Sequence, residues 1–194
     1  MKCLYPILLT SALSLLALHA KGEQVPIKLD WTGFRGGAYI TNNLILAGQP
    51  LNEQVMQKLS AEGVSTIINL RTPEEMADSV STPIDEAMLS DQLGIRYVQL
   101  PSGGPENPFS DETVRQFAEA FSGTEGKVLL HCNSGRRATH LWVAYLATHL
   151  KMDINEAIIL GQSANFGHLP LEGYLGSHLE YRLPKEPSSR LIHE

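Results

Sequence analysis

Short apolar runs alternate with segments of helical periodicity along residues 38–165. The runs are Ala38–Ile40, Leu44–Ala47, Val64–Leu70, Ile95–Leu100 and Lys127–His131. All are of strand length, and the β-branched run VSTIINL at residues 64–70 is typical of a strand buried on both faces. Between the runs, apolar residues recur every three or four positions, as they do in amphipathic helices. The chain is therefore predicted to alternate strands with helices.

Capping residues mark several of the predicted helices. Asn52 can cap a helix that continues to about Glu62, and Ser110 can cap another to about Phe121. The other predicted helices are a short one after Arg71, then Asp85–Leu93, Thr139–Leu150, one starting near Asn155, and Leu171–Tyr181. This order predicts an α/β domain with a central, mostly parallel sheet flanked by helices.

The two ends of the chain differ from its middle. A short positive start, a Leu-rich apolar stretch at residues 4–18 and the small residue Ala20 form the layout of a secretory signal peptide. We predict a signal peptide at 1–20, an irregular lead-in at 21–37, one domain at 38–183 and a flexible tail at 184–194. The chain would then be periplasmic or secreted, with no stable membrane insertion after cleavage. A retained N-terminal anchor is the alternative.

Composition limits the partners and cofactors. The chain has 194 residues, 43% of them hydrophobic, and a formal net charge of -6. This acidic balance argues against general binding to nucleic acid or to an anionic membrane surface. Cys3 lies in the predicted signal peptide, so Cys132 would be the single thiol of the mature chain. His140 and His149 lack a metal-ligand arrangement, and we expect neither a metal nor a cofactor.

The chemically suggestive residues are concentrated in HCNSGRR, residues 131–137. Cys132 follows a predicted strand, at the end where open α/β sheets hold their ligands. Gly135 permits a turn into a helix, whose N-terminal amides suit a tetrahedral oxyanion. Arg137 can hold two oxygens of that anion in a bidentate fork. The same positive surroundings favour the thiolate of Cys132, which is a nucleophile.

This loop resembles the signature loop of cysteine-dependent protein tyrosine and dual-specificity phosphatases. Other segments resemble, in order, the bacterial beta-lactamase hydrolase-like phosphatase branch: AGQP at 47–50, GVSTIINLR at 63–71, LP at 100–101 and HCNSGRRATHLWVAYL at 131–146. The resemblance covers roughly residues 38–165. It implies a dual-specificity-phosphatase-like fold and hydrolysis of a phosphomonoester through a cysteinyl-phosphate. The substrate would be a phosphoester or another small oxyanion, and a phosphoprotein is possible.

Two features depart from the phosphatase pattern. Four residues separate Cys132 from Arg137, whereas the usual phosphatase loop has five and rhodanese-type sulfurtransferases have four. The resemblance also implies an aspartate general acid in the segment PSGGPENPFSDE at 101–112, where small residues occupy the expected place. Glu106 is the nearest carboxylate and is the predicted acid, while Asp111 suits the start of a helix.

The predicted site combines catalytic residues with residues that bind the substrate. The catalytic set is Cys132, Arg137 and Glu106, and the binding set is His131, Asn133, Ser134, Gly135, Arg136 and Gln49. His131 could tune the cysteine or be structural, and Gln49 could line the pocket or form a turn. Three functions stay open: an exported phosphatase-like hydrolase, a sulfurtransferase that carries a persulfide on Cys132, and an oxyanion-binding protein without turnover.

Overall fold

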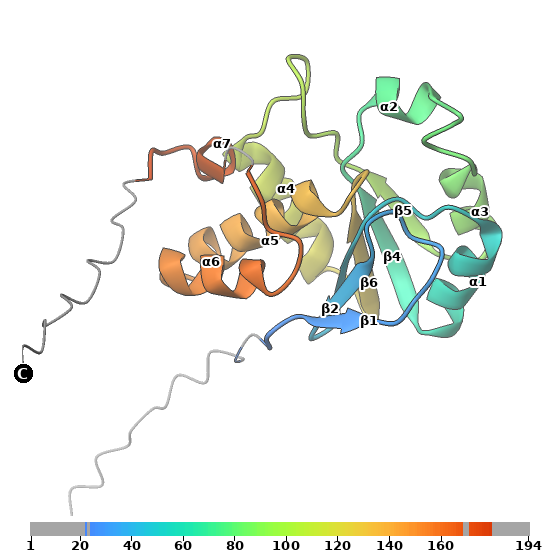
Figure 1. Cartoon of the computed structure of the whole chain (residues 1–194), viewed down its shortest axis with the longest axis horizontal. Coiled ribbons are helices and arrows are strands. Elements are labelled where there is room, and N and C mark those ends of the chain that lie inside the picture. Colours follow the sequence, from blue (N-terminus) through green and yellow to red (C-terminus); the bar gives the residue numbers. More distant parts are fainter. Residues whose placement is uncertain (1–21, 23, 169–170, 180–194) are drawn as a thin grey trace, which may run out of the picture.

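The computed structural model describes residue 22, residues 24–168 and residues 171–179. Six strands form one sheet in the order β1-β2-β3-β6-β4-β5 (Figure 1). The strands are β1 (Ile27–Leu29), β2 (Ala38–Thr41), β3 (Leu44–Ala47), β4 (Val64–Asn69), β5 (Arg96–Gln99) and β6 (Lys127–His131). The first three pair in antiparallel fashion, and β3, β6, β4 and β5 run parallel.

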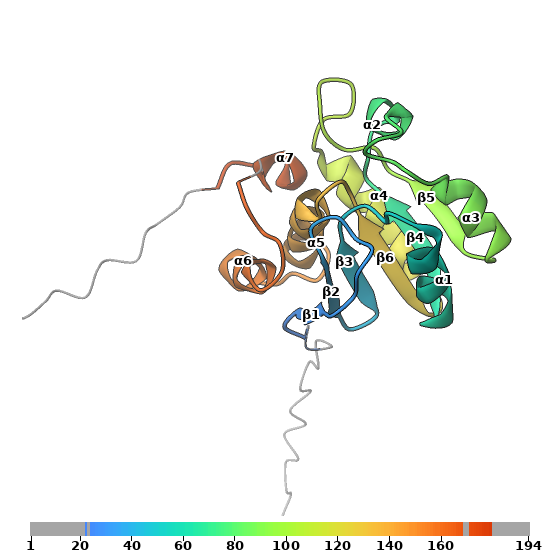
Figure 2. The same ribbon diagram turned by 45° about the vertical axis from the view of Figure 1, so that its right-hand side comes forward.

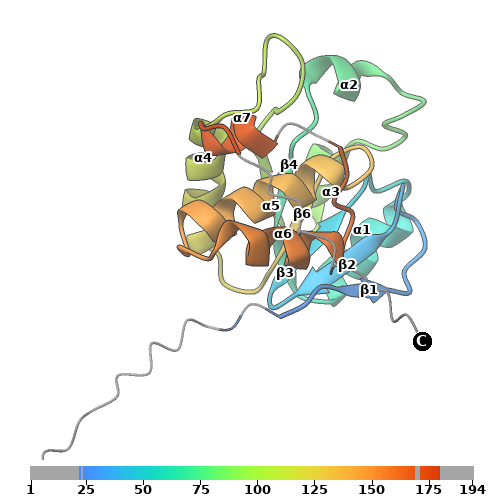
Figure 3. The same cartoon turned by 60° about the vertical axis from the view of Figure 1, so that its left-hand side comes forward.

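Helices cover both faces of the sheet (Figure 2). One face carries α1 (Glu53–Ala61) and α3 (Glu86–Gln92). The other carries α4 (Asp111–Ser122), α5 (Arg136–Thr148), α6 (Ile154–Gln162) and α7 (Leu171–Leu175), which stand in front of the sheet in Figure 3. The short α2 (Pro73–Ala77) lies near the end of β4. None of the helices in the described part of the chain is long and apolar enough to cross a membrane.

The two hydrophobic clusters follow from strand geometry, because successive side chains of a strand point to opposite faces. In β6, Val128 and Leu130 belong to the cluster beneath α4 and α5. Leu129 belongs to the cluster beneath α1 and α3. Cys132 continues the first set and is buried in the α4–α5 cluster. His131 follows Leu129 and is therefore directed to the opposite face.

Most of the predicted elements are present. The Asn52 carboxamide accepts a hydrogen bond from the amide of Val55 at 3.0 Å, which confirms the predicted cap of α1. The buried face of α1 is Val55, Met56 and Leu59. Ser110 caps α4 in the same way, with its Oγ 3.2 Å from the amide of Thr113. The predicted mostly parallel sheet flanked by helices is confirmed.

Three predicted elements differ from the structure. The lead-in at 21–37 is not wholly irregular, because Ile27–Leu29 pairs with β2; this edge strand is too short and too exposed to leave a hydrophobic pattern. The helix predicted over 171–181 ends at Leu175, where Gly176 takes a left-handed φ of 62°. The helix predicted from Thr139 begins at Arg136. The predicted signal peptide at 1–20 and tail at 184–194 lie outside the described residues.

Candidate active site

A pocket of about 490 Å³ opens at the carboxyl ends of the parallel strands. It is formed by α2, by the loop after β5, and by the turn between β6 and α5, which meet above the sheet in Figure 1. The lining residues are Thr72, Glu75, Gly103, Gly104, Phe109, Cys132, Asn133, Ser134, Arg136 and Arg137. The pocket thus brings together segments that are far apart in the sequence.

The turn after β6 is held by hydrogen bonds to its carbonyl groups. The Asn133 carbonyl accepts from the amide of Gln49 at 3.0 Å, and the Ser134 carbonyl accepts from the side chain of Asn165. The Gly135 carbonyl accepts from Thr139, through both its amide and its hydroxyl, each at 3.0 Å. With the carbonyls engaged outside the pocket, the turn has the form of an anion-binding loop at a helix N-terminus.

Two glycines permit this conformation. Gly135 caps α5 with a left-handed φ of 88°, which L side chains rarely adopt. At Gly48, an added Cβ would lie 1.6 Å from the carbonyl oxygen of Arg35 and 2.9 Å from that of Asn133. The signature turn therefore packs against backbone at a distance that only glycine allows.

Cys132 lies at the base of the pocket with its side chain 1% exposed. The amide of Gly135 donates a hydrogen bond to Sγ over 3.2 Å. A backbone N–H at the N-terminus of a helix is a donor that stabilises negative charge on sulfur. The sulfur therefore lies where the pocket meets the N-terminus of α5.

Arg137 is fixed at the pocket wall by Glu75. Its two terminal nitrogens donate to the two carboxylate oxygens at 2.8 and 2.6 Å, and Nη1 also donates to the carbonyls of Leu70 and Ser102. Burial alone would raise the pKa of Glu75, but the hydrogen bonds from Arg137 and the Thr72 amide outweigh it and lower that pKa. Glu75 is therefore an anionic orienting group for the guanidinium.

Sequence reasoning missed the role of Glu75. The sequence did contain a local pattern that involves this residue, because Thr72 and Glu75 form a T-x-x-E capping box at α2. In the structure the Thr72 amide donates to Oε2 of Glu75 at 2.9 Å, while both oxygens of the same carboxylate accept from Arg137. The capping pattern predicts the local bond but does not reveal a partner that is 62 residues away in the chain.

A buried polar network lies beneath the pocket and contains two of the predicted binding residues. Gln49 is fully buried and bonds through its carboxamide to Arg71 and Glu86. His131 is also fully buried, and its Nε2 lies 3.1 Å from Oε2 of Glu86. Neither side chain lines the pocket. The alternation of side chains along β6 explains why His131 faces this network instead of the pocket.

The other predicted site residues fall into two groups. Cys132, Arg137, Asn133, Ser134 and Arg136 line the pocket, and Gly135 contributes its amide. Glu106 is exposed on the loop after β5 and is not among the lining residues. The single carboxylate among those residues is Glu75.

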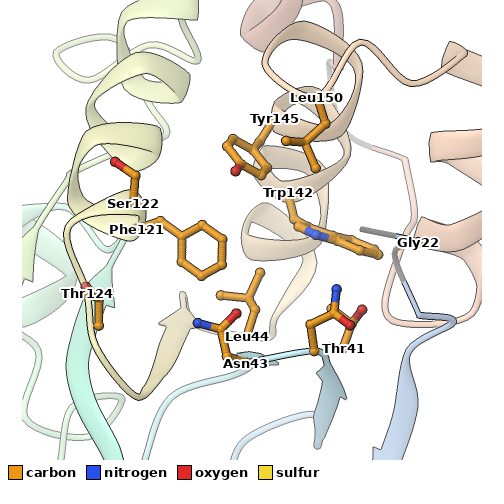
Figure 4. A pocket seen from close by; sticks show the side chains of 11 residues that line it. Gly22, Thr41, Asn43, Leu44, Phe121, Ser122, Thr124, Trp142, Tyr145 and Leu150 are labelled. Atoms are coloured by element: carbon orange, nitrogen blue, oxygen red, sulfur yellow. The ribbon is translucent and has the colours of Figure 1, made fainter. Parts of the chain in front are cut away.

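A second, larger cavity of about 750 Å³ lies at the opposite edge of the sheet (Figure 4). Its lining residues are Gly22, Thr41, Asn42, Asn43, Leu44, Phe121, Ser122, Thr124, Trp142, Tyr145 and Leu150, none of them charged. Figure 4 shows the ring of Phe121 on α4 across the cavity from Trp142 and Tyr145 on α5. An anion would find no cation among these side chains, so the smaller pocket is the candidate active site.

Comparisons with known proteins show the family of this chain. Residues 37–148 match the family model of the phosphatase-like domain of beta-lactamase hydrolase-like proteins. The beta-lactamase hydrolase-like protein of Agrobacterium fabrum is 33% identical over 105 residues, 54% of this chain and 23% of the relative. That of Xylella fastidiosa is 28% identical over 127 residues, 66% of this chain and 28% of the relative. The chain thus spans less than a third of the length of these curated relatives.

Solved structures support the fold. A DUF442 protein of Shewanella putrefaciens CN-32, a candidate phosphatase, superposes with a TM-score of 0.56 at 26% identity, covering 74% of this chain and 91% of that one. The kinase-associated phosphatase superposes with a TM-score of 0.56 at 17% identity, covering 70% of this chain and 89% of that one. These likenesses confirm the predicted dual-specificity-phosphatase-like fold.

Proposed function

Because the chain belongs to the family of the beta-lactamase hydrolase-like phosphatase domain, we propose that it is a cysteine-dependent phosphatase acting on phosphomonoesters. One observation carries this proposal. The Sγ of Cys132 lies at the base of a pocket, next to the Gly135 amide, with the guanidinium of Arg137 at the wall. A nucleophile, backbone donors and a bidentate cation around one small cavity are the groups that phosphoryl transfer requires.

In the proposed first step, the Cys132 thiolate attacks phosphorus and the ester P–O bond breaks. The loop amides and Arg137 stabilise the non-bridging oxygens, on which negative charge is concentrated. In the second step, water attacks the cysteinyl-phosphate, the S–P bond breaks and inorganic phosphate leaves. Sulfur departs as a thiolate, so the nucleophile is regenerated for the next cycle.

The leaving oxygen needs a proton unless it belongs to a good leaving group. We propose Glu106 as the donor, because it lies two residues after Gly104 on a loop that lines the pocket. This assignment requires the loop after β5 to turn toward the pocket when substrate binds. Removal of the carboxyl group in Glu106→Gln should slow alkyl phosphates more than aryl phosphates, because alkoxides are the poorer leaving groups. Equal slowing of both classes would exclude Glu106 as the acid.

We further propose that the chain is exported, on the basis of the signal-peptide pattern at residues 1–20. Cell fractionation of the expressed chain, followed by N-terminal sequencing, tests this directly. A mature N-terminus close to Lys21 in the periplasm or medium is expected. Recovery of an intact Met1 from the cytoplasm would contradict export and would leave the phosphatase proposal standing.

Hydrolysis of p-nitrophenyl phosphate by the purified chain and by Cys132→Ser is the decisive test of the activity. The serine variant keeps the shape of the pocket and lacks the thiolate, so its rate should fall by about 10³-fold or more. Trapping of a phosphorylated protein by rapid acid quench, with the phosphate on Cys132, would support the intermediate. Hydrolysis that survives Cys132→Ser would contradict the mechanism.

The spacing of four residues between Cys132 and Arg137 favours one second candidate, sulfur transfer through a persulfide on Cys132. The same preparation should then transfer sulfur from thiosulfate to cyanide and carry the mass of one extra sulfur. If turnover of phosphate esters is absent while vanadate binds tightly, a non-catalytic oxyanion-binding role replaces both. Parallel assays with phosphate esters and thiosulfate therefore separate the three functions.

A further inference from the structure

Two adjacent arginines line the candidate active site, and they differ in their partners. Arg137 is held by the two carboxylate oxygens of Glu75 at 2.8 and 2.6 Å. Arg136, the first residue of α5, forms no ion pair within the described part of the chain, and its guanidinium donates no hydrogen bond there. The charge of Arg136 is therefore available to a molecule bound in the pocket.

The two arginines reach the pocket from different walls. Nη1 of Arg137 donates to the carbonyls of Leu70 at 3.2 Å and Ser102 at 2.7 Å, which places it beside the end of β4 and the loop after β5. Consecutive side chains of a helix point about 100° apart. Arg136 lies instead against the segment after α6, where a Cβ added to Gly167 would be 3.5 Å from its Nε and 3.9 Å from its Cζ. The two guanidiniums are thus directed to different parts of a bound molecule.

A buried histidine connects the backbone of Arg136 to the segment on which its side chain lies. His140 is fully buried, with Nδ1 2.8 Å from the carbonyl oxygen of Arg136 and Nε2 2.9 Å from that of Gly167. Phe166 stacks on the imidazole, and the two ring centroids are 4.1 Å apart. Arg136 is therefore positioned before a ligand arrives, which lowers the entropy cost of binding an anion.

The charges of the lining residues favour a ligand with more than one anionic group. The charged side chains with a fixed sign are Glu75, Arg136 and Arg137. Glu75 offsets the charge of Arg137, so the positive charge left over belongs to Arg136. The turn amides and Arg137 serve the phosphoryl group in the proposed reaction. Arg136 is then the lining cation that can offset a negative charge elsewhere on the substrate.

We propose that Arg136 is a specificity-determining residue, which binds a second anionic group on the alcohol or phenol part of the substrate. The inference rests on the proposed function, in which the phosphoryl group to be transferred occupies the cysteine turn. A planar guanidinium holds two oxygens of a carboxylate or of a phosphate in the same fork. The substrates are therefore phosphomonoesters that carry a second oxyanion, and simple alkyl or aryl monophosphates bind more weakly.

Binding of three esters to the Cys132→Ser chain tests this proposal without turnover. The probes are phenyl phosphate, its meta-carboxylate derivative and its meta-phosphate derivative, which differ in the second substituent alone. Isothermal titration calorimetry should show at least one derivative binding about tenfold more tightly than phenyl phosphate, the effect of one additional charge-assisted hydrogen-bonded pair. The derivative that gains affinity identifies the second group as a carboxylate or a phosphate.

Arg136→Ala in the same background should reduce this preference to about twofold or less, because the fork is removed. Continued binding of phenyl phosphate shows that the variant is folded, and a ratio of affinities cancels effects common to all three esters. Arg96→Ala is the matched control. Arg96 is also exposed, but it begins β5, at the end of the sheet opposite the pocket. Its removal takes the same charge from the chain and should leave the preference in place.

Three results would overturn the inference: equal affinity for all three esters in Cys132→Ser, a preference that survives Arg136→Ala, or an equal loss of preference in Arg96→Ala. Hydrolysis of phenyl phosphate by the parent chain is measured alongside. Hydrolysis without the binding preference would exclude the second anion site and leave the phosphatase proposal standing. A preference that depends on Arg136, without hydrolysis, would support the anion site and contradict the phosphatase proposal.

Discussion

The two cavities at opposite edges of the sheet differ in charge more than in size. The larger one, about 750 Å³, is lined by aromatic, aliphatic and uncharged polar side chains. The smaller one, about 490 Å³, contains two arginines, one glutamate and the buried cysteine. Size alone would therefore select the larger cavity, whereas the charged lining residues favour the smaller one as the site for an anion.

The difference follows from where strands end. In the parallel part of the sheet, the carboxyl ends of β3, β6 and β4 meet at one edge. The segments that follow them are the AGQP turn, the cysteine turn and the start of α2. Their backbone groups and polar side chains converge, while the α5 N-terminus adds its amides. The C-terminal part of α5 instead presents Trp142 and Tyr145 to the larger cavity (Figure 4).

After loss of the cysteine nucleophile itself, the largest effect is expected at Arg137. If the smaller pocket binds the phosphoryl group, Arg137→Ala should lower kcat/KM for p-nitrophenyl phosphate by about 10²- to 10³-fold, as loss of a preorganised donor does. Arg136→Ala is the comparison variant, because this exposed side chain lines the same pocket without the carboxylate partner of its neighbour. The fall in kcat/KM for Arg136→Ala should stay below about tenfold. Equal falls in kcat/KM for the two variants would mean that the pocket attracts the substrate through its overall positive charge, and not through the fixed guanidinium of Arg137.

The second effect concerns the packing of the cysteine turn. Gly48→Ala places a Cβ against the carbonyl oxygens of Arg35 and Asn133, so the turn must move. We expect a loss of free energy of unfolding of about 3 kcal/mol, at the upper end of overpacking costs. Gly63→Ala, at a φ of 83° with nothing near its Cβ, should cost only about 1 kcal/mol. Urea denaturation measures the free energy of unfolding of both variants. Similar losses in the two would contradict the role of close packing at Gly48.

A smaller effect is expected at Glu75, which orients Arg137. Glu75→Gln should lower kcat between about 10- and 100-fold, because a misaligned guanidinium loses its bidentate geometry. Its stability effect should depend on pH. The pKa of Glu75 is lowered in the folded state, so its ionic stabilisation is present above the usual value of about 4.5 and is lost as pH falls below it.

Thermal denaturation from pH 7 to pH 3 checks this dependence. The parent should be more stable than Glu75→Gln at pH 7, by about 1 kcal/mol for a partly exposed pair. The difference should shrink as the pH falls through the range in which Glu75 takes up a proton. A constant difference would mean that packing, and not the ion pair, distinguishes the two chains.

The sequence predicts the elements well where local signals are strong. Asn52 and Gly63 bound α1, and VSTIINL contains β4, because capping groups and buried strands leave patterns of a few residues. Cys132 and Arg137 are predicted because they lie together in a short motif, HCNSGRR at residues 131–137. The pairing of Arg137 with Glu75 was not predicted, because it depends on how the turn after β4 approaches α5.

Gln49 and His131 are two residues whose place in the site was not predicted correctly from the sequence. Both stand next to a recognised motif, yet their side chains belong to the network around Glu86. The period of two along β6 assigns His131 to the face opposite Cys132, so this part was readable in principle. The contact with Glu86 was not readable, since it depends on how α3 packs under the sheet.

The smallest effect on activity is expected for a substitution in the larger cavity. This substitution tests most directly whether the two cavities differ in function. Ser122, exposed at the end of α4, lines that cavity (Figure 4). Ser122→Trp should fill part of it and change kcat/KM and vanadate affinity by less than about twofold, because no charged lining group or part of the cysteine turn is altered. A fall as large as that of Glu75→Gln, with unfolding unchanged, would mean that α5 couples the two cavities. The larger cavity would then need a place in the mechanism.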